Sequence, residues 1–253
     1  MRFAVLGSGS RGNATLIESR GSRVLVDCGF ALREIERRLA DIEVAAASIG
    51  AIVVTHEHSD HVTGVARLAT RHGIEVWTSP GTWKGAGAPE VPGLRLFNGH
   101  GRGFGIGDLR FRPIPVPHDA REPCQFTVEG DGRRLGILTD TGCLTARIRE
   151  HLRECDSLIL ETNHDPHLLR DGPYPPSVQR RIAGPFGHLS NQQAAEVLDA
   201  VNHRGLRRVL LSHISARNNR AELALEAVRG VDSGIDAAFL VAEQDRATGW
   251  LEV

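Results

Sequence analysis

The sequence predicts an α/β fold in which two mixed β-sheets pack together and carry helices on their outer sides. Near the start, short apolar runs follow one another with only turn residues between them, as antiparallel hairpins require. Further along, apolar runs alternate with amphipathic segments, an order typical of parallel strands connected by helices. We find no interdomain linker among the 253 residues. We therefore expect one domain covering residues 1–253.

The first part of the chain contains short apolar runs bounded by turn residues, and apolar residues spaced three and four apart. Leu32, Ile35 and Leu39 have the second spacing and predict a helix. The elements expected here are strands at Arg2–Leu6, Ala14–Glu18 and Val24–Val26, a helix at Leu32–Leu39, a strand at Ala51–Val54, a loop at Thr55–His61, a helix at about Val62–His72, a strand at Glu75–Thr78, and loops with weak edge hairpins over Pro80–Gly107.

The rest of the chain shows the same alternation. The elements expected there are strands at Arg110–Val116, Gln125–Val128 and Leu135–Leu138, a helix near Leu144–Leu152, a strand at Ser157–Leu160, a helix at Gln192–Val201, a strand at Arg208–Leu211, a helix at Ala221–Val228 and a strand at Ala237–Val241. The segment around Tyr174 has no clear period and is expected to be irregular.

Gly7, Gly9 and Gly12 have the G-x-G-x-x-G spacing of dinucleotide-binding proteins. In those proteins the motif opens a helix, whereas here a short stretch with β-branched residues leads directly to the next turn at Arg20-Gly21. We therefore favour a tight hairpin whose backbone amides can face an anion.

Charge and composition narrow the function only coarsely. The 30 basic residues nearly balance the 31 acidic ones, which excludes a globally basic nucleic-acid-binding surface but not a local basic patch. Lys84 is the only lysine, so every other residue in that basic count is an arginine. Genome base composition and phosphate binding by guanidinium groups would both produce this bias.

The four cysteines have no C-x-x-C spacing, which argues against a thiolate zinc site or a disulfide framework. We expect reduced core residues at Cys28, Cys124, Cys143 and Cys155. No stretch approaches the roughly 20 apolar residues of a membrane helix, and Met1–Leu6 lacks the pattern of a secretion signal. We therefore expect a cytoplasmic protein that does not enter a membrane.

The histidines are clustered. The segment Thr55-His56-Glu57-His58-Ser59-Asp60-His61 directly follows a predicted buried strand. His56 and His58 lie two residues apart and can face one metal ion, while Asp60 and His61 turn toward a second. Three further candidates follow other strands, namely His118, Asp140 and His213. These nitrogen and oxygen donors suit two divalent ions that share a carboxylate, with Zn, Mn or Fe as candidates. The structural alternative is a solvated histidine-rich loop.

Five ordered segments resemble the motifs of the metallo-β-lactamase fold: Val26-Asp27-Cys28-Gly29, the H-x-H-x-D-H loop, His118, Asp140 and Leu211-Ser212-His213. The resemblance spans nearly the whole chain and implies a four-layer αββα sandwich of two mixed β-sheets. It implies that His56, His58 and His118 hold one ion, that Asp60, His61 and His213 hold the other, and that Asp140 bridges them. Asp27 would orient the metal-binding loop without touching the ions, or would be an ordinary acid in a turn.

The resemblance also implies a reaction. Two ions about 3.5 to 4 Å apart would hold a bridging hydroxide and clamp the oxygens of an in-line displacement, so hydrolysis is expected. Asp60 would orient that nucleophile or take its proton, besides binding a metal ion.

The superfamily cleaves β-lactams, thioesters, lactones and phosphodiesters, so the fold alone does not name a substrate. Glu161 and His188 resemble an extra Glu and His of phosphodiesterase members such as tRNase Z. There the Glu supports the His, which protonates the leaving oxygen, and a carboxylate partner raises the pKa of a histidine. The alternatives are a surface acid at Glu161 and, since Ser190 and Gln193 fit a capping box, a plain loop residue at His188.

The chain is most similar to the single-domain YycJ-like (WalJ-type) group, which is associated with 5′→3′ exonuclease action on DNA. The similarity rests on Gly7-Ser8-Gly9, Glu161-Thr162-Asn163-His164-Asp165, Gly172-Pro173-Tyr174-Pro175 and Asn218-Asn219. The group usually has Ser where this chain has Thr162, a departure that keeps the hydroxyl. Secreted lactamases, glyoxalase II and β-CASP nucleases fit less well, because we find no signal peptide, no helical substrate domain and no cap insertion.

The segment around Tyr174 is rich in arginine, as is the segment after His213. The arginines are Arg170, Arg180 and Arg181 in the first segment and Arg217 and Arg220 in the second. A cationic groove with one aromatic side chain is typical of a channel for single-stranded nucleic acid, and a solvated surface is the alternative. The substrate contacts that we expect are Tyr174, Arg170, Arg217 and Asn191.

We therefore expect a dinuclear metal-dependent phosphodiesterase, specifically a 5′→3′ exodeoxyribonuclease that acts on DNA with single-stranded character. One alternative is a hydrolase of small cyclic or activated phosphodiesters, since no exosite is obvious. Another is a non-nuclease metal-binding accessory protein of the same fold. The sequence names no protein partner.

Overall fold

The computed structural model describes residues 1–231 and 237–253. Its strands form two seven-stranded sheets, with the orders β14-β1-β2-β3-β4-β5-β6 and β13-β12-β11-β10-β9-β8-β7. The strands of the first sheet are β1 (Arg2–Gly7), β2 (Ala14–Ser19), β3 (Ser22–Val26), β4 (Ala51–Val53), β5 (Glu75–Thr78), β6 (Gly93–Leu96) and β14 (Leu251–Glu252). Those of the second are β7 (Phe104–Ile106), β8 (Leu109–Pro115), β9 (Cys124–Gly130), β10 (Arg133–Leu138), β11 (Ser157–Glu161), β12 (Arg208–Ser212) and β13 (Ala238–Val241).

Each sheet has an antiparallel half and a parallel half. In the first, β1 to β3 pair antiparallel and β3 to β6 pair parallel. In the second, β7 to β10 pair antiparallel and β10 to β13 pair parallel. The helices are α1 (Leu32–Ala40), the 3₁₀ turn η1 (Ala46–Ser48), α2 (Ser59–Val62), α3 (Val65–His72), α4 (Pro80–Gly85), α5 (Ala146–Leu152), α6 (Pro166–Arg170), α7 (Pro176–Ile182), α8 (Asn191–Val201) and α9 (Ala221–Arg229).

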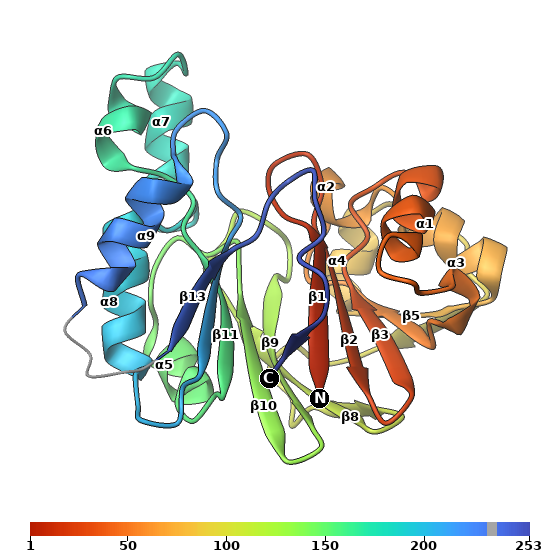
Figure 1. Cartoon of the computed structure of the whole chain (residues 1–253). Coiled ribbons are helices and arrows are strands. Elements are labelled where there is room, and N and C mark those ends of the chain that lie inside the picture. Colours follow the sequence, from red (N-terminus) through yellow and green to blue (C-terminus); the bar gives the residue numbers. More distant parts are fainter. Residues whose placement is uncertain (232–236) are drawn as a thin grey trace.

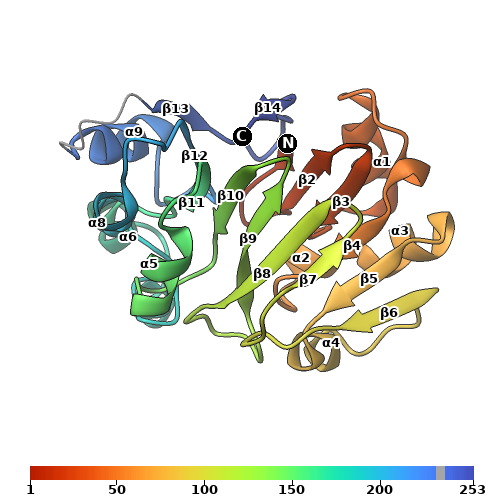
Figure 2. The ribbon, with the colours of Figure 1, turned by 90° about the horizontal axis from the view of Figure 1, so that it is seen from below.

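Strand β1 shows how the layers are built. Phe3 and Val5 belong to the core between the two sheets, together with side chains from β8 to β12. Ala4 and Leu6 point the other way and pack with Ile35 of α1, because successive side chains of a strand alternate between its faces. A third cluster packs α5, α8 and α9 against the outer face of the second sheet. The two sheets thus face each other with helices outside both (Figure 1; Figure 2), which confirms the predicted αββα sandwich of two mixed sheets.

Several expectations held and others were wrong. Gly7, Gly9 and Gly12 lie in or beside the β1–β2 turn, and β1 and β2 are antiparallel, so the hairpin interpretation is confirmed. The four cysteines are free, as expected, but Cys143 is only partly buried. The expectation of one domain stays a prediction. In the described part of the chain, no helix is both long and apolar enough to span a bilayer.

The helix predicted at Val62–His72 begins at Val65 as α3, and the predicted loop at Thr55–His61 is wrong at its end, because a separate short helix, α2, begins at Ser59. Gly64 separates the two helices where the chain touches the loop after β3, and a Cβ at Gly64 would lie only 2.1 Å from the carbonyl oxygen of Phe30. The close approach requires glycine, and it allows the short helix α2 to carry Asp60 and His61.

Two segments that we expected to lack helices contain them. Pro80–Gly107 includes α4, whose N-cap Ser79 accepts a hydrogen bond from the amide of Thr82. The segment around Tyr174 includes α6, capped by Asp165, and α7. All three helices have proline at their first turn, a position that proline favours. These helices are too short to show an apolar period, and we therefore interpreted their prolines as loop residues.

Candidate active site

The predicted functional residues gather at one edge of the sandwich. Parallel strands β10, β11 and β12 end there, as do β3 and β4 of the other sheet, and β8 runs in the same direction as β10. A cleft of about 410 Å³ opens at this edge. It is lined by residues of the H-x-H-x-D-H loop, by Asp140, His188 and His213, and by residues of α7.

Three imidazoles converge at one end of the cluster. His58 Nδ1 lies 3.2 Å from His56 Nε2 and 3.2 Å from His118 Nε2. The outer nitrogens of two of them are held by neighbours, since His56 Nδ1 lies 3.0 Å from Thr55 Oγ1 and His118 Nδ1 lies 3.1 Å from the carbonyl oxygen of Gly187. Burial and the neighbouring imidazoles lower the pKa of His56 far below its usual value. A neutral imidazole is the form that binds a metal ion.

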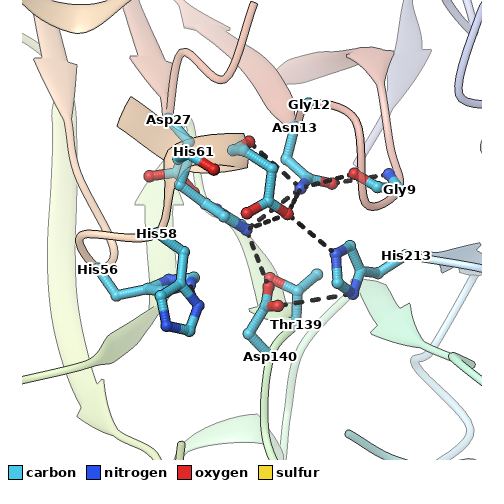
Figure 3. Close-up of polar contacts among 12 residues, drawn as sticks. Gly9, Gly12, Asn13, Asp27, His56, His58, His61, Thr139, Asp140 and His213 are labelled. Carbon is cyan, nitrogen blue, oxygen red and sulfur yellow. Dashed lines mark hydrogen bonds and ion pairs between the residues drawn. The ribbon is translucent and has the colours of Figure 1, made fainter. Parts of the chain in front are cut away.

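A second group lies beside the first. Asp60 Oδ2 lies 3.5 Å from His61 Nε2 and 3.6 Å from His213 Nε2. Asp140 stands between the two groups. One of its carboxylate oxygens lies 3.3 Å from His61 Nε2 (Figure 3), and the other lies 4.0 Å from His118 Nε2. The structure therefore brings all seven expected ligands together.

Asp27 lies behind this cluster. Its Oδ2 is 2.8 Å from His61 Nδ1, and its Oδ1 accepts a hydrogen bond of 2.8 Å from the amide of Thr55. The Thr55 hydroxyl donates to the same carboxylate and also contacts His56. Asp27 thus fixes the ring of His61 with Nε2 facing Asp60 and Asp140.

The electrostatics of the cluster suit a bound cation. Burial disfavours the charged form of His61, but Asp140 and Asp27 outweigh it and raise the pKa of His61 to about 9. A metal ion would replace the proton that these carboxylates favour. Among the buried side-chain atoms of the described residues that have no hydrogen-bond partner, two belong to the proposed ligands, His213 Nε2 and Asp140 Oδ2. Unpaired buried polar atoms are costly, and here they face a set of nitrogen and oxygen donors. The clusters therefore fit divalent metal binding.

Glu161 and His188 form a pair at the edge of this cluster. His188 Nδ1 lies 2.8 Å from Glu161 Oε1, and His213 Nδ1 lies 3.0 Å from the same oxygen. Burial would lower the pKa of His188, but the attraction and hydrogen bond of Glu161 outweigh it and raise this pKa. Glu161 is fully buried, so the alternative of a surface acid is wrong.

The capping box that we considered as an alternative for this segment also exists. The Ser190 hydroxyl accepts from the amide of Gln193, and the Gln193 side chain accepts from the amide of Ser190. The box begins helix α8 two residues after His188, and it leaves the imidazole free to line the cleft. The two interpretations of this segment are therefore compatible.

The structure brings only part of the expected substrate-contact set to the cleft. Tyr174 lines it, and the Arg217 guanidinium lies 5.6 Å from the centre of the Tyr174 ring. Arg181 lines it too, whereas Arg180 does not belong to its lining.

Two members of the set lie elsewhere. Arg170 is exposed and makes a bidentate ion pair with Asp171. Asn191 is buried and exchanges two side-chain hydrogen bonds with Asn219, which closes the start of α8 onto the loop before α9. We therefore no longer assign a substrate contact to Arg170 or Asn191.

Sequence reasoning missed several residues of the site. Asn13 donates to Asp60 Oδ2 at 3.2 Å, and its Oδ1 accepts from the amide of Gly9 at 2.9 Å (Figure 3). Asn13 directly follows the glycine motif, and this position was the available signal. Thr55 and Asp119 were also missed, although each is a sequence neighbour of a predicted ligand.

The backbone is unusual at three of the site residues. Asp27, Asp140 and His213 all have positive φ angles, of 60°, 51° and 53°. Non-glycine residues adopt this left-handed conformation rarely, and Asp, Asn and His adopt it more often than others. In each case the turn directs the side chain from a strand end toward the cluster.

Comparison with known proteins agrees with this architecture. A family model described as "Beta-lactamase superfamily domain" matches residues 22–214. The chain belongs to the β-lactamase superfamily. The structure of the metallo-β-lactamase fold protein YhfI from Bacillus subtilis has the same fold, with a TM-score of 0.75, 14% identity, and coverage of 97% of this chain and 98% of YhfI.

Two curated proteins are similar to this chain along nearly their whole length. Exodeoxyribonuclease WalJ of Streptococcus pneumoniae serotype 2 (strain D39 / NCTC 7466) is 31% identical over 264 residues, which cover 100% of this chain and 98% of WalJ. Exodeoxyribonuclease YycJ of Bacillus anthracis is 32% identical over 254 residues, with coverage of 97% and 96%.

Proposed function

We propose that this superfamily member is a metal-dependent 5′→3′ exodeoxyribonuclease. The observation that carries the proposal is the buried Glu161 carboxylate, which contacts both His188 and His213 and so places a proton donor beside the ion-binding cluster. Proteins similar over the whole chain are named exodeoxyribonucleases, which supports DNA as the substrate.

The donors divide into two sets. His56, His58 and His118 would hold one divalent ion, and Asp60, His61 and His213 would hold the other. Asp140 would bridge them, since its two oxygens face different groups. When bound, such ions lower the pKa of water toward neutrality and neutralise charge on a phosphate.

Asp60 would orient the attacking water. Its Oδ2 lies between the two imidazoles of its group and accepts a hydrogen bond from Asn13. The pKa of Asp60 stays below its usual value, because contacts with His213 and His61 outweigh the effect of burial. The carboxylate is therefore charged and ready to accept a hydrogen bond from water.

His188 would protonate the leaving oxygen. Its Nδ1 is occupied by Glu161, so its Nε2 is the nitrogen available to the substrate in the cleft. Glu161 stabilises the protonated ring, as a general acid requires near neutral pH. Tyr174 would stack with a base of a single-stranded end, with Arg217 above its ring.

The decisive experiment incubates the Zn- or Mn-loaded protein with single- and double-stranded DNA and RNA, labelled at either end. We expect a 5′ label to be released as mononucleotide at once, while 3′-labelled DNA shortens progressively. His188→Ala should lower kcat by a factor of about 10² to 10⁴ without loss of metal. His167→Ala is the control, because this exposed histidine of α6 does not line the cleft.

Other outcomes would change the assignment. Turnover of a small chromogenic phosphodiester without turnover or competition by DNA would indicate a small-molecule phosphodiesterase. Cleavage of circular single-stranded DNA would indicate an endonuclease. A metal-loaded protein that hydrolyses none of these substrates would refute the proposal.

A further inference from the structure

An ion pair crosses the mouth of the cleft. Arg181, in the last turn of α7, donates to Asp119 Oδ2 from Nη1 at 3.3 Å. Asp119 directly follows His118 in the loop between β8 and β9, and both residues of the pair line the cleft. The pair therefore connects α7 to the loop that carries a proposed metal ligand.

We infer that Arg181 binds a phosphate of the substrate and that Asp119 holds it until the substrate displaces the carboxylate. This inference rests on the proposed function, because it requires a phosphodiester substrate. Arg181 is the only arginine or lysine among the described residues that line the cleft, whereas Asp60, Asp119 and Asp140 are all there. Arg181 is therefore the guanidinium that a polyanion meets within the cleft itself.

The geometry of the Arg181–Asp119 pair allows a phosphate to replace Asp119. The Arg181 side chain is 68% exposed, and an exposed ion pair of this kind is weak because water screens it. A phosphate presents two oxygens to the planar guanidinium and forms stronger, bidentate hydrogen bonds. Phosphate can therefore replace Asp119 as the partner of Arg181.

When a phosphate replaces Asp119 at Arg181, the Asp119 carboxylate has other partners close by. Its other oxygen, Oδ1, already lies 3.7 Å from His58 Nε2 and 3.5 Å from His118 Nε2. His58 is the most exposed of the proposed histidine ligands, and its outer nitrogen lacks the close contact that Thr55 gives to His56. A small shift of Asp119 toward His58 would keep the carboxylate paired and steady this imidazole when DNA is bound.

The geometry also links Arg181 to the proposed proton donor. The amide of His188 donates to the carbonyl oxygen of Ile182, the last residue of α7, at 2.9 Å. A Cβ at Gly187 would lie 2.2 Å from the carbonyl oxygen of Arg181, so only glycine allows this approach. A phosphate held by Arg181 is thus positioned relative to His188.

Binding tests this inference separately from turnover. We would measure, by fluorescence anisotropy, the Kd of a fluorescent single-stranded oligonucleotide for the metal-loaded protein in a His188→Ala background, which slows turnover. Arg181→Ala should raise Kd about tenfold and reduce the slope of log Kd against log salt by about 0.7, the value for one lost phosphate contact on a single strand. Arg180→Ala removes the same charge from the neighbouring, exposed position and should change both quantities much less.

Asp119→Asn tests the partner. Because the amide binds Arg181 weakly, Kd should fall about threefold, and this gain should shrink when Arg181→Ala is also present. Metal content is measured for every variant so that loss of an ion is not mistaken for loss of a contact.

Equal effects of Arg181→Ala and Arg180→Ala would overturn the inference, as would an Asp119→Asn gain that is independent of Arg181. The proposed function can fail while the inference holds. This is the conclusion if Arg181→Ala weakens oligonucleotide binding but the protein without any substitution has no nuclease activity. An oligonucleotide that does not bind at all would contradict both.

Discussion

Glu161 joins the two parts of the site at the scale of a single residue. Its Oε1 contacts Nδ1 of both His188 and His213, and its Oε2 accepts from the amides of Leu189 and Thr141. The carboxylate is fully buried, so these contacts are not screened by water. One charge therefore supports a proposed proton donor and a proposed metal ligand at once.

Glu161→Gln should lower kcat about 100-fold and move the alkaline limb of the pH profile to lower pH. Burial lowers the pKa of His188, whereas Glu161 and, to a smaller extent, Asp140 raise it. The neutral amide removes the larger of these two opposing contributions, so His188 loses its proton at lower pH. The measurement is kcat on DNA as a function of pH. Asp27→Asn is the matched control, because Asp27 contacts His61 and not His188. Asp27→Asn should weaken metal binding and leave the alkaline limb of the pH profile at the same pH. A limb that does not move in Glu161→Gln would refute the role of this pair.

At the scale of elements, the β1–β2 turn and the loop after β3 support α2 through their backbones. The amide of Asn13 donates to the carbonyl oxygen of Asp60, and the amide of Cys28 donates to that of His61. A Cβ at Gly29 would lie only 1.7 Å from the carbonyl oxygen of Asp60. The positions of Asp60 and His61 therefore depend on the absence of a side chain at Gly29.

Gly29→Ala should reduce the free energy of unfolding by about 2 to 3 kcal/mol and also weaken metal binding, because α2 must move away. Gly50→Ala is the control, since its nearest neighbour, the Arg23 carbonyl oxygen, would be 3.5 Å from the new Cβ. Urea unfolding and metal titration of both variants measure the two effects. Equal stabilities of the two variants would contradict the role of this contact.

The β1–β3 hairpins carry a carboxylate between two arginines. Glu18 pairs with Arg2 and Arg23, and these contacts outweigh burial and lower its pKa from 4.5. A lowered folded-state pKa means that the stabilisation is complete above the unfolded value of 4.5 and is lost as pH falls through the lower folded value. Glu18→Gln should therefore destabilise the protein by about 1 kcal/mol at neutral pH and by progressively less below pH 4.5. Urea unfolding of both proteins across this range measures the difference, and a constant difference would contradict the assignment.

The sequence predicted the elements with strong periods and missed those defined by caps. Strands such as Arg208–Leu211 were found because a fully buried strand is a continuous apolar run. Helices α4, α6 and α7 were missed, because five to seven residues contain too few apolar positions to show a period. Their N-terminal prolines and the caps Ser79 and Asp165 were the usable signals.

The same limit applies to the site. His56, His58, Asp60 and His61 were grouped correctly because they are neighbours in the chain, and Asp140 because a strand ends before it. Asn191 was misplaced because its direction depends on the rotation of α8, which the sequence does not specify. Arg170 was misplaced because Asp171 beside it offers a local partner.

At the scale of the whole molecule, the cluster connects the two sheets. Asp27 and the residues from His56 to His61 follow strands of the first sheet, whereas His118, Asp140 and His213 follow strands of the second. Below the cluster, buried apolar side chains of the two sheets pack against each other. An ion bound at this edge would add a second connection between the sheets.

Removal of metal should therefore lower the melting temperature. An ion present at 100 times its Kd stabilises a protein by about 2.7 kcal/mol, which corresponds to roughly 5 to 10 °C for a chain of this size. Calorimetry before and after chelation measures the change, and we expect a single transition in both states if the chain is one domain. Asp140→Asn should show a smaller difference. An unchanged melting temperature after complete metal removal would refute a structural contribution of the ions.

The positive φ angles of Asp27, Asp140 and His213 limit how this site can change during evolution. In a lineage that loses the activity, metal ligands are no longer needed at these three turns. The positive φ angles still disfavour β-branched and bulky residues there. The backbone then leaves glycine, asparagine, aspartate and histidine as the replacements with least strain. Inactive descendants of this protein should therefore carry Gly or Asn at these three positions, whereas His56 and His58, whose φ angles are not positive, should drift to many residue types.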